Sequence, residues 1–238
     1  MGEWTRLKAA DGHEFRAWRS AGPEPMAGLV VVQEIFGVNA HIREVADRYA
    51  GMGFAAVAPA LFDRAEKGVE LGYAEADIAQ GRELRSKFSW DASLLDLAAA
   101  AESVRGAGRV GVIGYCWGGS MAWRIAASES SRQTYKSGGD SPAAASVPVD
   151  AAVCYYGAQI VDYIREKPKC PALLIFGDED ASIPPATIAA IRAAHPGVAV
   201  EIYPGPHGFA CDHRAAYRPE AARAAFARAF DFLARNLR

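Results

Sequence analysis

The stretch Gly114-Tyr115-Cys116-Trp117-Gly118 determines how the rest of the chain is interpreted. It follows the apolar run 110–113 and precedes a helix-compatible segment, 119–127. A strand, a tight turn and a helix in this order form a nucleophile elbow, whose glycines let strand and helix approach closely. The sequence therefore predicts that Cys116 is a nucleophile facing the N–H groups at the start of a helix. The alternative is a glycine-containing connection with an ordinary buried cysteine.

Two polar segments downstream of Cys116 each follow an apolar strand. The run 172–176 precedes Gly177-Asp178-Glu179-Asp180, and the run 198–203 precedes Pro204-Gly205-Pro206-His207-Gly208. The order nucleophile, acid, base, with acid and base just beyond strand ends, is typical of the α/β-hydrolase fold. The sequence therefore predicts a triad of Cys116, an aspartate and His207.

Composition narrows the class of partner. The 238 residues are 51% hydrophobic, and 26 basic residues against 28 acidic ones give a net charge of −2. Such a balance offers no basic surface for nucleic acid or an anionic membrane, so a small-molecule substrate is expected. Charged residues throughout positions 1–20 argue against a signal peptide, and no apolar run approaches the ~18 residues of a membrane span. We therefore expect a cytoplasmic protein.

The four cysteines, at positions 116, 154, 170 and 211, show no C-x-x-C spacing. The positions of the four cysteines therefore indicate neither a zinc site nor a disulfide framework, and we expect no metal and no cofactor. Free thiols fit a reducing compartment.

Short apolar runs alternate with longer amphipathic stretches along the chain. The turn dipeptide Asp11-Gly12 predicts a hairpin between 4–8 and 14–18. Alternation of strands and helices predicts a single α/β domain over 1–238, and the Ser-, Gly-, Ala- and Pro-rich segment 128–148 is predicted to be an exposed loop insertion. Further strands are predicted at 29–33, 54–58, 110–113, 151–156, 172–176 and 198–203, and helices at 40–51, 73–87, 92–105, 119–127 and 219–237.

Five motifs stand in unbroken order along the chain. They are Gln33-Glu34-Ile35-Phe36-Gly37-Val38-Asn39, Gly114-Tyr115-Cys116-Trp117-Gly118-Gly119, Tyr155-Tyr156-Gly157, Gly177-x-x-Asp180 with Pro184, and His207-Gly208-Phe209. Together they resemble the dienelactone hydrolase family, the carboxymethylenebutenolidases, over residues 10–236. The resemblance implies an α/β-hydrolase fold with a mostly parallel central sheet of about eight strands and helices on both faces. It also implies hydrolysis of a lactone or ester, in the family an enol-lactone converted to maleylacetate.

The resemblance assigns roles to individual residues. It implies that Cys116 is the nucleophile, His207 the general base and then acid, and Asp180 the residue that orients His207. The rival acid is Asp178 and the rival base His213. The other three histidines, His13, His41 and His195, are expected at the surface. The oxyanion hole would consist of the backbone N–H groups of Ile35 and Trp117.

Glu34 follows a buried strand in an otherwise apolar segment, where a carboxylate is costly to desolvate without a partner. In the family the corresponding glutamate contacts the cysteine and helps generate the thiolate when substrate displaces it, which protects the resting thiol from oxidation. The alternatives are that Glu34 caps the helix beginning near Asn39 or pairs with an arginine.

The chain departs from the family where the substrate carboxylate binds. The two arginines of the family are replaced here by Cys211 and Ile78. Neighbouring arginines could supply the clamp instead, or the pocket could take neutral esters. The tentative substrate-binding residues are Arg82, Arg85, Tyr155, Phe209 and Arg214, with Trp90 and Trp117 as further aromatic lining.

Three function classes stay open. The first is a dienelactone-type hydrolase, and the second is a general carboxylesterase or thioesterase on the same scaffold. The third is a redox-sensitive thiol protein or binding module, which would have no need for Glu34, Asp180 and His207 together. We expect a monomer or a homodimer.

Overall fold

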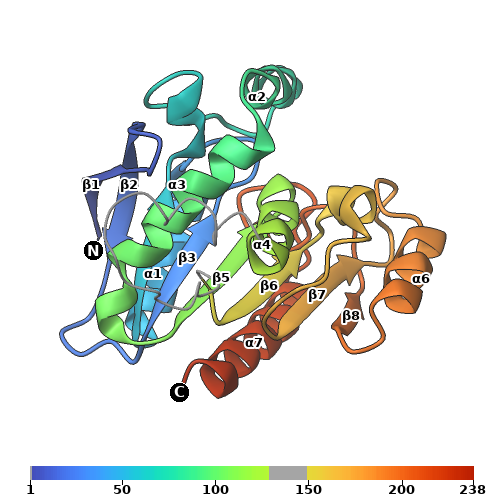
Figure 1. Cartoon of the computed structure of the whole chain (residues 1–238). Coiled ribbons are helices and arrows are strands. Elements are labelled where there is room, and N and C mark those ends of the chain that lie inside the picture. Colours follow the sequence, from blue (N-terminus) through green and yellow to red (C-terminus); the bar gives the residue numbers. More distant parts are fainter. Residues whose placement is uncertain (1, 129–148) are drawn as a thin grey trace.

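The computed structural model describes residues 2–128 and 149–238, which build one eight-stranded sheet in the order β1-β2-β4-β3-β5-β6-β7-β8 (Figure 1). Six strands are parallel: β3 (Ala27–Val32), β4 (Phe54–Pro59), β5 (Val110–Tyr115), β6 (Ala151–Tyr155), β7 (Ala172–Gly177) and β8 (Ala199–Tyr203). The hairpin β1 (Glu3–Lys8) and β2 (Glu14–Ser20) adds an antiparallel edge. The predicted fold class is confirmed, and each predicted strand lies within two residues of an observed one.

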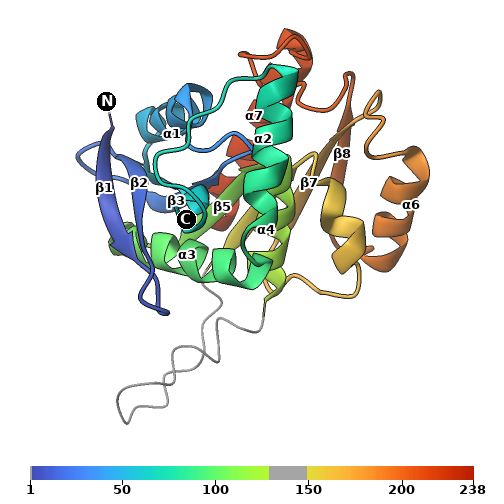
Figure 2. The same cartoon turned by 90° about the horizontal axis from the view of Figure 1, so that it is seen from above.

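Helices cover both faces of this sheet (Figure 2). Helices α1 (Ala40–Gly51) and α7 (Pro219–Asn236) lie on one face, and α3 (Trp90–Ser103) and α4 (Trp117–Ala127) lie on the other. Asn39 caps α1 by accepting from the N–H of Ile42 at 3.3 Å, and Ser89 caps α3 by accepting from Ala92 at 3.1 Å. These polar caps explain where the two helices begin.

Helix α2 (Glu75–Ser86) matches the prediction, whereas α6 (Pro185–Ala194) was not predicted. Pro185 stands in the first turn of α6, where its missing N–H costs nothing, so the proline starts this helix rather than preventing it. Three short 3-10 turns complete the described fold: η1 (Leu61–Arg64), η2 (Arg105–Ala107) and η4 (Ala158–Tyr163). Apart from Ser128, the insertion predicted at 128–148 lies outside the described residues.

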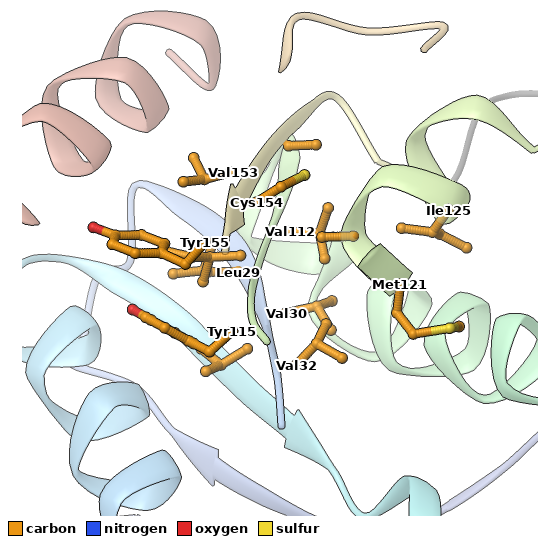
Figure 3. Packing of buried hydrophobic residues seen from close by; sticks show 14 of the residues in the cluster. Leu29, Val30, Val32, Val112, Tyr115, Met121, Ile125, Val153, Cys154 and Tyr155 are labelled. Carbon is orange, nitrogen blue, oxygen red and sulfur yellow. The ribbon is translucent and has the colours of Figure 1, made fainter. Parts of the chain in front are cut away.

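The core is continuous through the sheet (Figure 3). Met121 and Ile125 of α4 pack onto Val112 on one face, while the rings of Tyr115 and Tyr155 lie on the opposite face, stacked with centroids 4.8 Å apart. All five side chains are buried, which fixes the carboxyl ends of β5 and β6 against the helices.

No helix in the described part of the chain is both long enough and apolar enough to cross a membrane.

Candidate active site

The predicted site residues converge at one edge of the sheet. Glu34 follows β3, Cys116 follows β5, Asp180 follows β7 and His207 follows β8. The carboxyl ends of parallel strands lie at the same edge, which is where open α/β sheets bind ligands. Cys116 and His207 line a cavity of about 700 Å³ at this edge, with α2 forming part of its wall.

Cys116 occupies a strained turn, with φ 57° and ψ −120°. A side chain at Gly114 would clash with the carbonyl oxygen of Gly118, and one at Gly118 would clash with that of Gln33. Only glycine therefore allows β5 and α4 to approach closely enough to form the elbow. Cys116 itself stands at the N-cap of α4, so the partial positive charge of the helix faces its sulfur.

His207 is held between Asp180 and Cys116. Its Nδ1 lies 2.7 Å from Oδ2 of Asp180, and its ring lies close enough to the Cys116 side chain for the sulfur to raise the pKa of the imidazole. The other carboxylate oxygen of Asp180 accepts from the N–H of Ser182 at 2.8 Å. Both oxygens of Asp180 are thus engaged, which fixes the carboxylate and leaves Nε2 of His207 for the sulfur.

The electrostatic environment favours the charged forms of both His207 and Asp180. Burial lowers the pKa of His207, but the neighbouring Cys116 and the hydrogen bond with Asp180 outweigh it and raise this pKa to about 10. Burial raises the pKa of Asp180, but the hydrogen bond with His207, the charge of His207 and the contacts with Ser182 together outweigh that effect and hold this pKa below the ordinary value. At neutral pH His207 is therefore an imidazolium beside an aspartate, the state that stabilises a thiolate.

This contact predicts a change in the titration of His207. In Cys116→Ala the largest cause that raises the pKa is removed, so the imidazolium should lose its proton at a lower pH than in the native protein. Titration of the ring by nuclear magnetic resonance measures the shift. Cys154→Ala, which removes a buried thiol elsewhere, is the control and should leave the titration of His207 unchanged. An unchanged titration in Cys116→Ala would contradict the contact.

Glu34 is 1% exposed and pairs with Arg214, whose guanidinium donates to Oε1 at 3.2 Å. Of the alternatives set out above, the structure therefore shows the arginine pair, while Asn39 itself caps α1. Burial lowers the pKa of Arg214, but the nearby Glu34 carboxylate and, to a smaller extent, groups that include the Cys116 sulfur raise it above the ordinary value. The guanidinium of Arg214 therefore lies near both the buried carboxylate and the thiol.

The two predicted oxyanion donors both lie on the cavity. Trp117 is the first residue of α4, where backbone N–H groups have no partner within the helix. Ile35 lines the same cavity, and α2 packs against its carbonyl oxygen at Gly81, where any side chain would clash. This close approach holds α2 beside the segment that carries Glu34 and Ile35.

All three candidate arginines line the cavity. Ile78, Arg82 and Arg85 stand on one face of α2, as their spacing of four and three residues requires, and Arg214 joins them from beyond β8. The guanidinium of Arg85 lies 5.4 Å from the centre of the Trp90 ring. Within residues 2–128 and 149–238 neither Arg82 nor Arg85 forms an ion pair, so both remain able to bind an anion.

The rival acid and base both lie in other contacts. Asp178 accepts from the N–H of Gly205 at 2.9 Å and so fixes the loop after β8. His213 lies 2.8 Å from a carboxylate oxygen of Glu44 on α1. Neither Asp178 nor His213 lines the cavity. His207 does line it, and Asp180 contacts His207.

Two tentative pocket residues are corrected by the structure. Tyr155 and Phe209 do not line the cavity: Tyr155 packs on the α1 and α7 face against Tyr115, and Phe209 is fully buried beside Tyr156. Tyr156, one residue past β6, is the tyrosine beside His207, with ring centroids 5.0 Å apart. Since side chains alternate between faces along a strand, one residue decides which tyrosine reaches the site. Lining residues not predicted from the sequence are Phe36, Ala158, Gln159, Asp162 and Ser182.

The expectation that three histidines lie at the surface was wrong for two of them. His41 is 2% exposed and His195 7% exposed, whereas His13 is partly exposed. His195 is held by the carbonyl oxygen of Ile164 at 2.8 Å, and His41 by Asp212 at 3.1 Å. These polar partners allow the rings to be buried.

Comparisons with known proteins agree with this geometry. The model of the dienelactone hydrolase family matches residues 15–134 and 140–237. The carboxymethylenebutenolidases of Pseudomonas putida and Pseudomonas knackmussii are each 34% identical to this chain, over 98% of its length and 96% of theirs. The crystal structure of a Klebsiella pneumoniae protein assigned to the dienelactone hydrolases superposes with a TM-score of 0.76, at 28% identity, over 98% of this chain and 99% of that one. This chain belongs to the dienelactone hydrolase family and is a hydrolase of ester bonds.

Proposed function

We propose that the protein hydrolyses a lactone or ester that carries a carboxylate, through a covalent intermediate on Cys116. The observation that carries the proposal is the connected set of Cys116, His207 and Asp180 at the cavity, with Nδ1 of His207 lying 2.7 Å from Asp180. A nucleophile, a base and an orienting carboxylate in this arrangement suit acyl transfer. A protein that used Cys116 only as a redox-sensitive thiol would need neither His207 nor Asp180.

The first half-reaction forms a thioester. The thiolate of Cys116 attacks the carbonyl carbon, and the carbonyl electron pair moves onto oxygen, which the N–H groups of Ile35 and Trp117 stabilise. The carbonyl re-forms as the bond to the leaving oxygen breaks, and His207 gives its proton to that oxygen. In a lactone the resulting hydroxyl stays attached to the acyl group.

The second half-reaction uses water. His207, now neutral, takes a proton from a water molecule as the water oxygen attacks the thioester carbonyl. Collapse of this intermediate expels the Cys116 thiolate and releases the acid, and the imidazolium beside Asp180 is restored. The aspartate does not take up the proton, because its pKa lies below the ordinary value.

Glu34 and Arg214 form the part of the site that substrate can rearrange. Arg214 is the partner of Glu34 and also lines the cavity, so a carboxylate entering there competes for the same guanidinium. In this proposal Glu34 then becomes available to the thiol, in keeping with the role of the corresponding glutamate in the family. Because Glu34 is released only when a substrate carboxylate binds Arg214, the Cys116 thiol is fully activated only in the substrate-bound state.

A carboxylate-bearing substrate is favoured by the two arginines of α2, which form no ion pair in the described part of the chain. Arg82 and Arg85 share the helix face that lines the cavity, and guanidinium groups bind carboxylates with two parallel hydrogen bonds. Without such partners, an anion moved into a pocket walled by Trp117 and Phe36 would lose several kcal/mol of hydration free energy. The arginines therefore favour the anion over a neutral ester.

Substitution of these arginines tests the substrate class. In Arg82→Met and Arg85→Met we expect KM for an anionic dienelactone to rise about tenfold with little change in kcat, because one charge-assisted hydrogen bond is worth about 1.5 kcal/mol. KM for a neutral aryl ester should change little. The measurement is kcat/KM for both substrates in each variant.

Lys87→Met is the matched control, since Lys87 directly follows α2, is exposed and lies outside the cavity lining. It should affect neither substrate. An anionic preference that survives both arginine replacements would contradict this map of the pocket. Neutral esters hydrolysed at least as well as the dienelactone by the native protein would favour the alternative, a general carboxylesterase or thioesterase. Arg214→Met is less informative, because it also leaves the buried Glu34 without its partner.

A further inference from the structure

We propose that Glu34, His41 and Cys211 form a buried zinc site beside the catalytic cavity. One ligand atom from each side chain lies within 4.8 Å of the other two, and the exposed fractions are 1%, 2% and 0%. The three residues come from different parts of the chain: the segment after β3, the first turn of α1 and the loop after β8. Cysteine spacing in the sequence therefore gave no indication of this site.

Two atoms of this cluster are buried without a hydrogen-bond partner in the described part of the chain. They are Oε2 of Glu34 and Nε2 of His41. A buried acceptor left unsatisfied costs about 1–3 kcal/mol, so such atoms require an explanation. The other oxygen of Glu34 accepts from Arg214, and Nδ1 of His41 lies 3.1 Å from Asp212. A cation between the two unpaired atoms would satisfy both at once.

The contact between His41 and Asp212 is the arrangement expected around a metal-binding histidine. A carboxylate that accepts the proton of one ring nitrogen fixes the tautomer and leaves the lone pair of the other nitrogen for the metal. Asp212 fills this role from the partly exposed end of the cluster. One ligand atom each of His41, Asp212 and the more exposed His213 also lie within 4.8 Å of one another, so a second group of metal-ligand side chains adjoins the site on its exposed side.

The donor set favours zinc over other common cations. A thiolate, an imidazole and a carboxylate are the ligands that Zn²⁺ takes, whereas Mg²⁺ and Ca²⁺ prefer oxygen alone. Ligands placed ~2.0–2.3 Å from a tetrahedral zinc ion lie roughly 3.3–3.8 Å from one another, so only small side-chain rotations are needed. Three protein ligands leave the fourth position for water.

Charge balance also agrees with a divalent cation. With Cys211 as thiolate, the ligands Glu34 and Cys211 hold two negative charges, while Asp212 also pairs with Arg48 and Glu34 with Arg214. The two charges of Zn²⁺ match those of its two anionic ligands, which favours burial of the ion. The metal would bind Oε2 of Glu34, and Oε1 would keep its contact with Arg214.

Equilibrium dialysis of the full chain with Zn²⁺ tests the proposal. Cys116 and His207 form a second thiol and imidazole pair, so all variants are prepared in the Cys116→Ala background. We expect one zinc ion per chain there, and a loss of affinity of more than about 100-fold on adding His41→Ala or Cys211→Ala. Cys154→Ala, which removes an equally buried thiol, is the matched control and should bind as the background does.

A second measurement identifies the ligand atom. Co²⁺ substituted for zinc should give a thiolate-to-cobalt charge-transfer absorption band in Cys116→Ala that disappears in Cys116→Ala/Cys211→Ala. Asp212→Asn changes a partly exposed residue and should weaken zinc binding by about 10–100-fold. This variant replaces His41→Ala or Cys211→Ala in the test if either of those fails to fold.

Each contrary result is distinguishable from failure of the proposed catalysis, because none depends on turnover. Absence of zinc binding in the native chain would overturn the proposal. Zinc lost in Cys116→Ala alone would assign binding to the catalytic pair instead. Unchanged binding in folded His41→Ala or Cys211→Ala would exclude these residues as ligands.

Discussion

Cys116→Ala should abolish ester hydrolysis while the fold is retained. Removing the nucleophile of a comparable triad costs about 10⁶-fold in kcat, because the covalent intermediate on sulfur can no longer form. Alanine is smaller than cysteine and has the same Cβ at φ 57°, so the strained turn is no less tolerable to it. The measurement is kcat for an aryl ester together with the thermal unfolding temperature.

The intermediate itself provides a second readout. Mass spectrometry of the quenched native reaction should find an acyl group on the peptide that contains Cys116, and none in Cys116→Ala. Retained turnover in Cys116→Ala would contradict the mechanism.

Cys116→Ser is the conservative comparison and should keep only weak activity. A hydroxyl is far harder to ionise than a thiol, so the positive charge of His207 assists a serine nucleophile much less. Activity equal to that of the native enzyme would show that the site does not depend on a thiolate.

Asp180→Asn should lower kcat by about 10⁴-fold, the effect measured for the corresponding change in a serine protease. An asparagine side chain can present its N–H₂ group to Nδ1 of His207, which stabilises the wrong tautomer and gives no charge stabilisation to the imidazolium. The pKa of His207 should also fall, so the alkaline limb of the pH–rate profile should move to lower pH. Activity of the purified variant across a pH series measures both effects.

Asp178→Asn is the matched control, two residues away on the same loop. Its Oδ1 accepts from the N–H of Gly205, and the asparagine oxygen can still accept there, so the effect on kcat should be small. A large loss in Asp178→Asn with little change in Asp180→Asn would transfer the role to Asp178.

The sheet and the positions of the site residues were predictable because they depend on local patterns. Buried parallel strands such as β3 and β5 are short, continuous apolar runs, and the glycines of the elbow follow from close backbone approach. Chain order then indicated Asp180 and His207, since each comes soon after a strand whose end lies at the same edge.

Features that depend on side-chain direction were not predictable in the same way. Tyr155 and Tyr156 are adjacent in sequence, and only the exact end of β6 determines which one reaches His207. The pairing of Glu34 with Arg214 joins residues 180 positions apart, beyond any local pattern. The burial of His41 has the same cause, because Asp212 comes from the far end of the chain.

The packing of Gly81 against the carbonyl oxygen of Ile35 has a consequence for the diversification of this enzyme. Since this contact is made by backbone atoms, it does not depend on which side chains α2 presents. Ile78, Arg82 and Arg85 can therefore be exchanged while the distance between α2 and Ile35, the proposed oxyanion donor, is kept. New substrate preferences can arise by substitution on one helix face without re-evolving the chemistry, and a library restricted to these three positions would be an economical starting point for directed evolution.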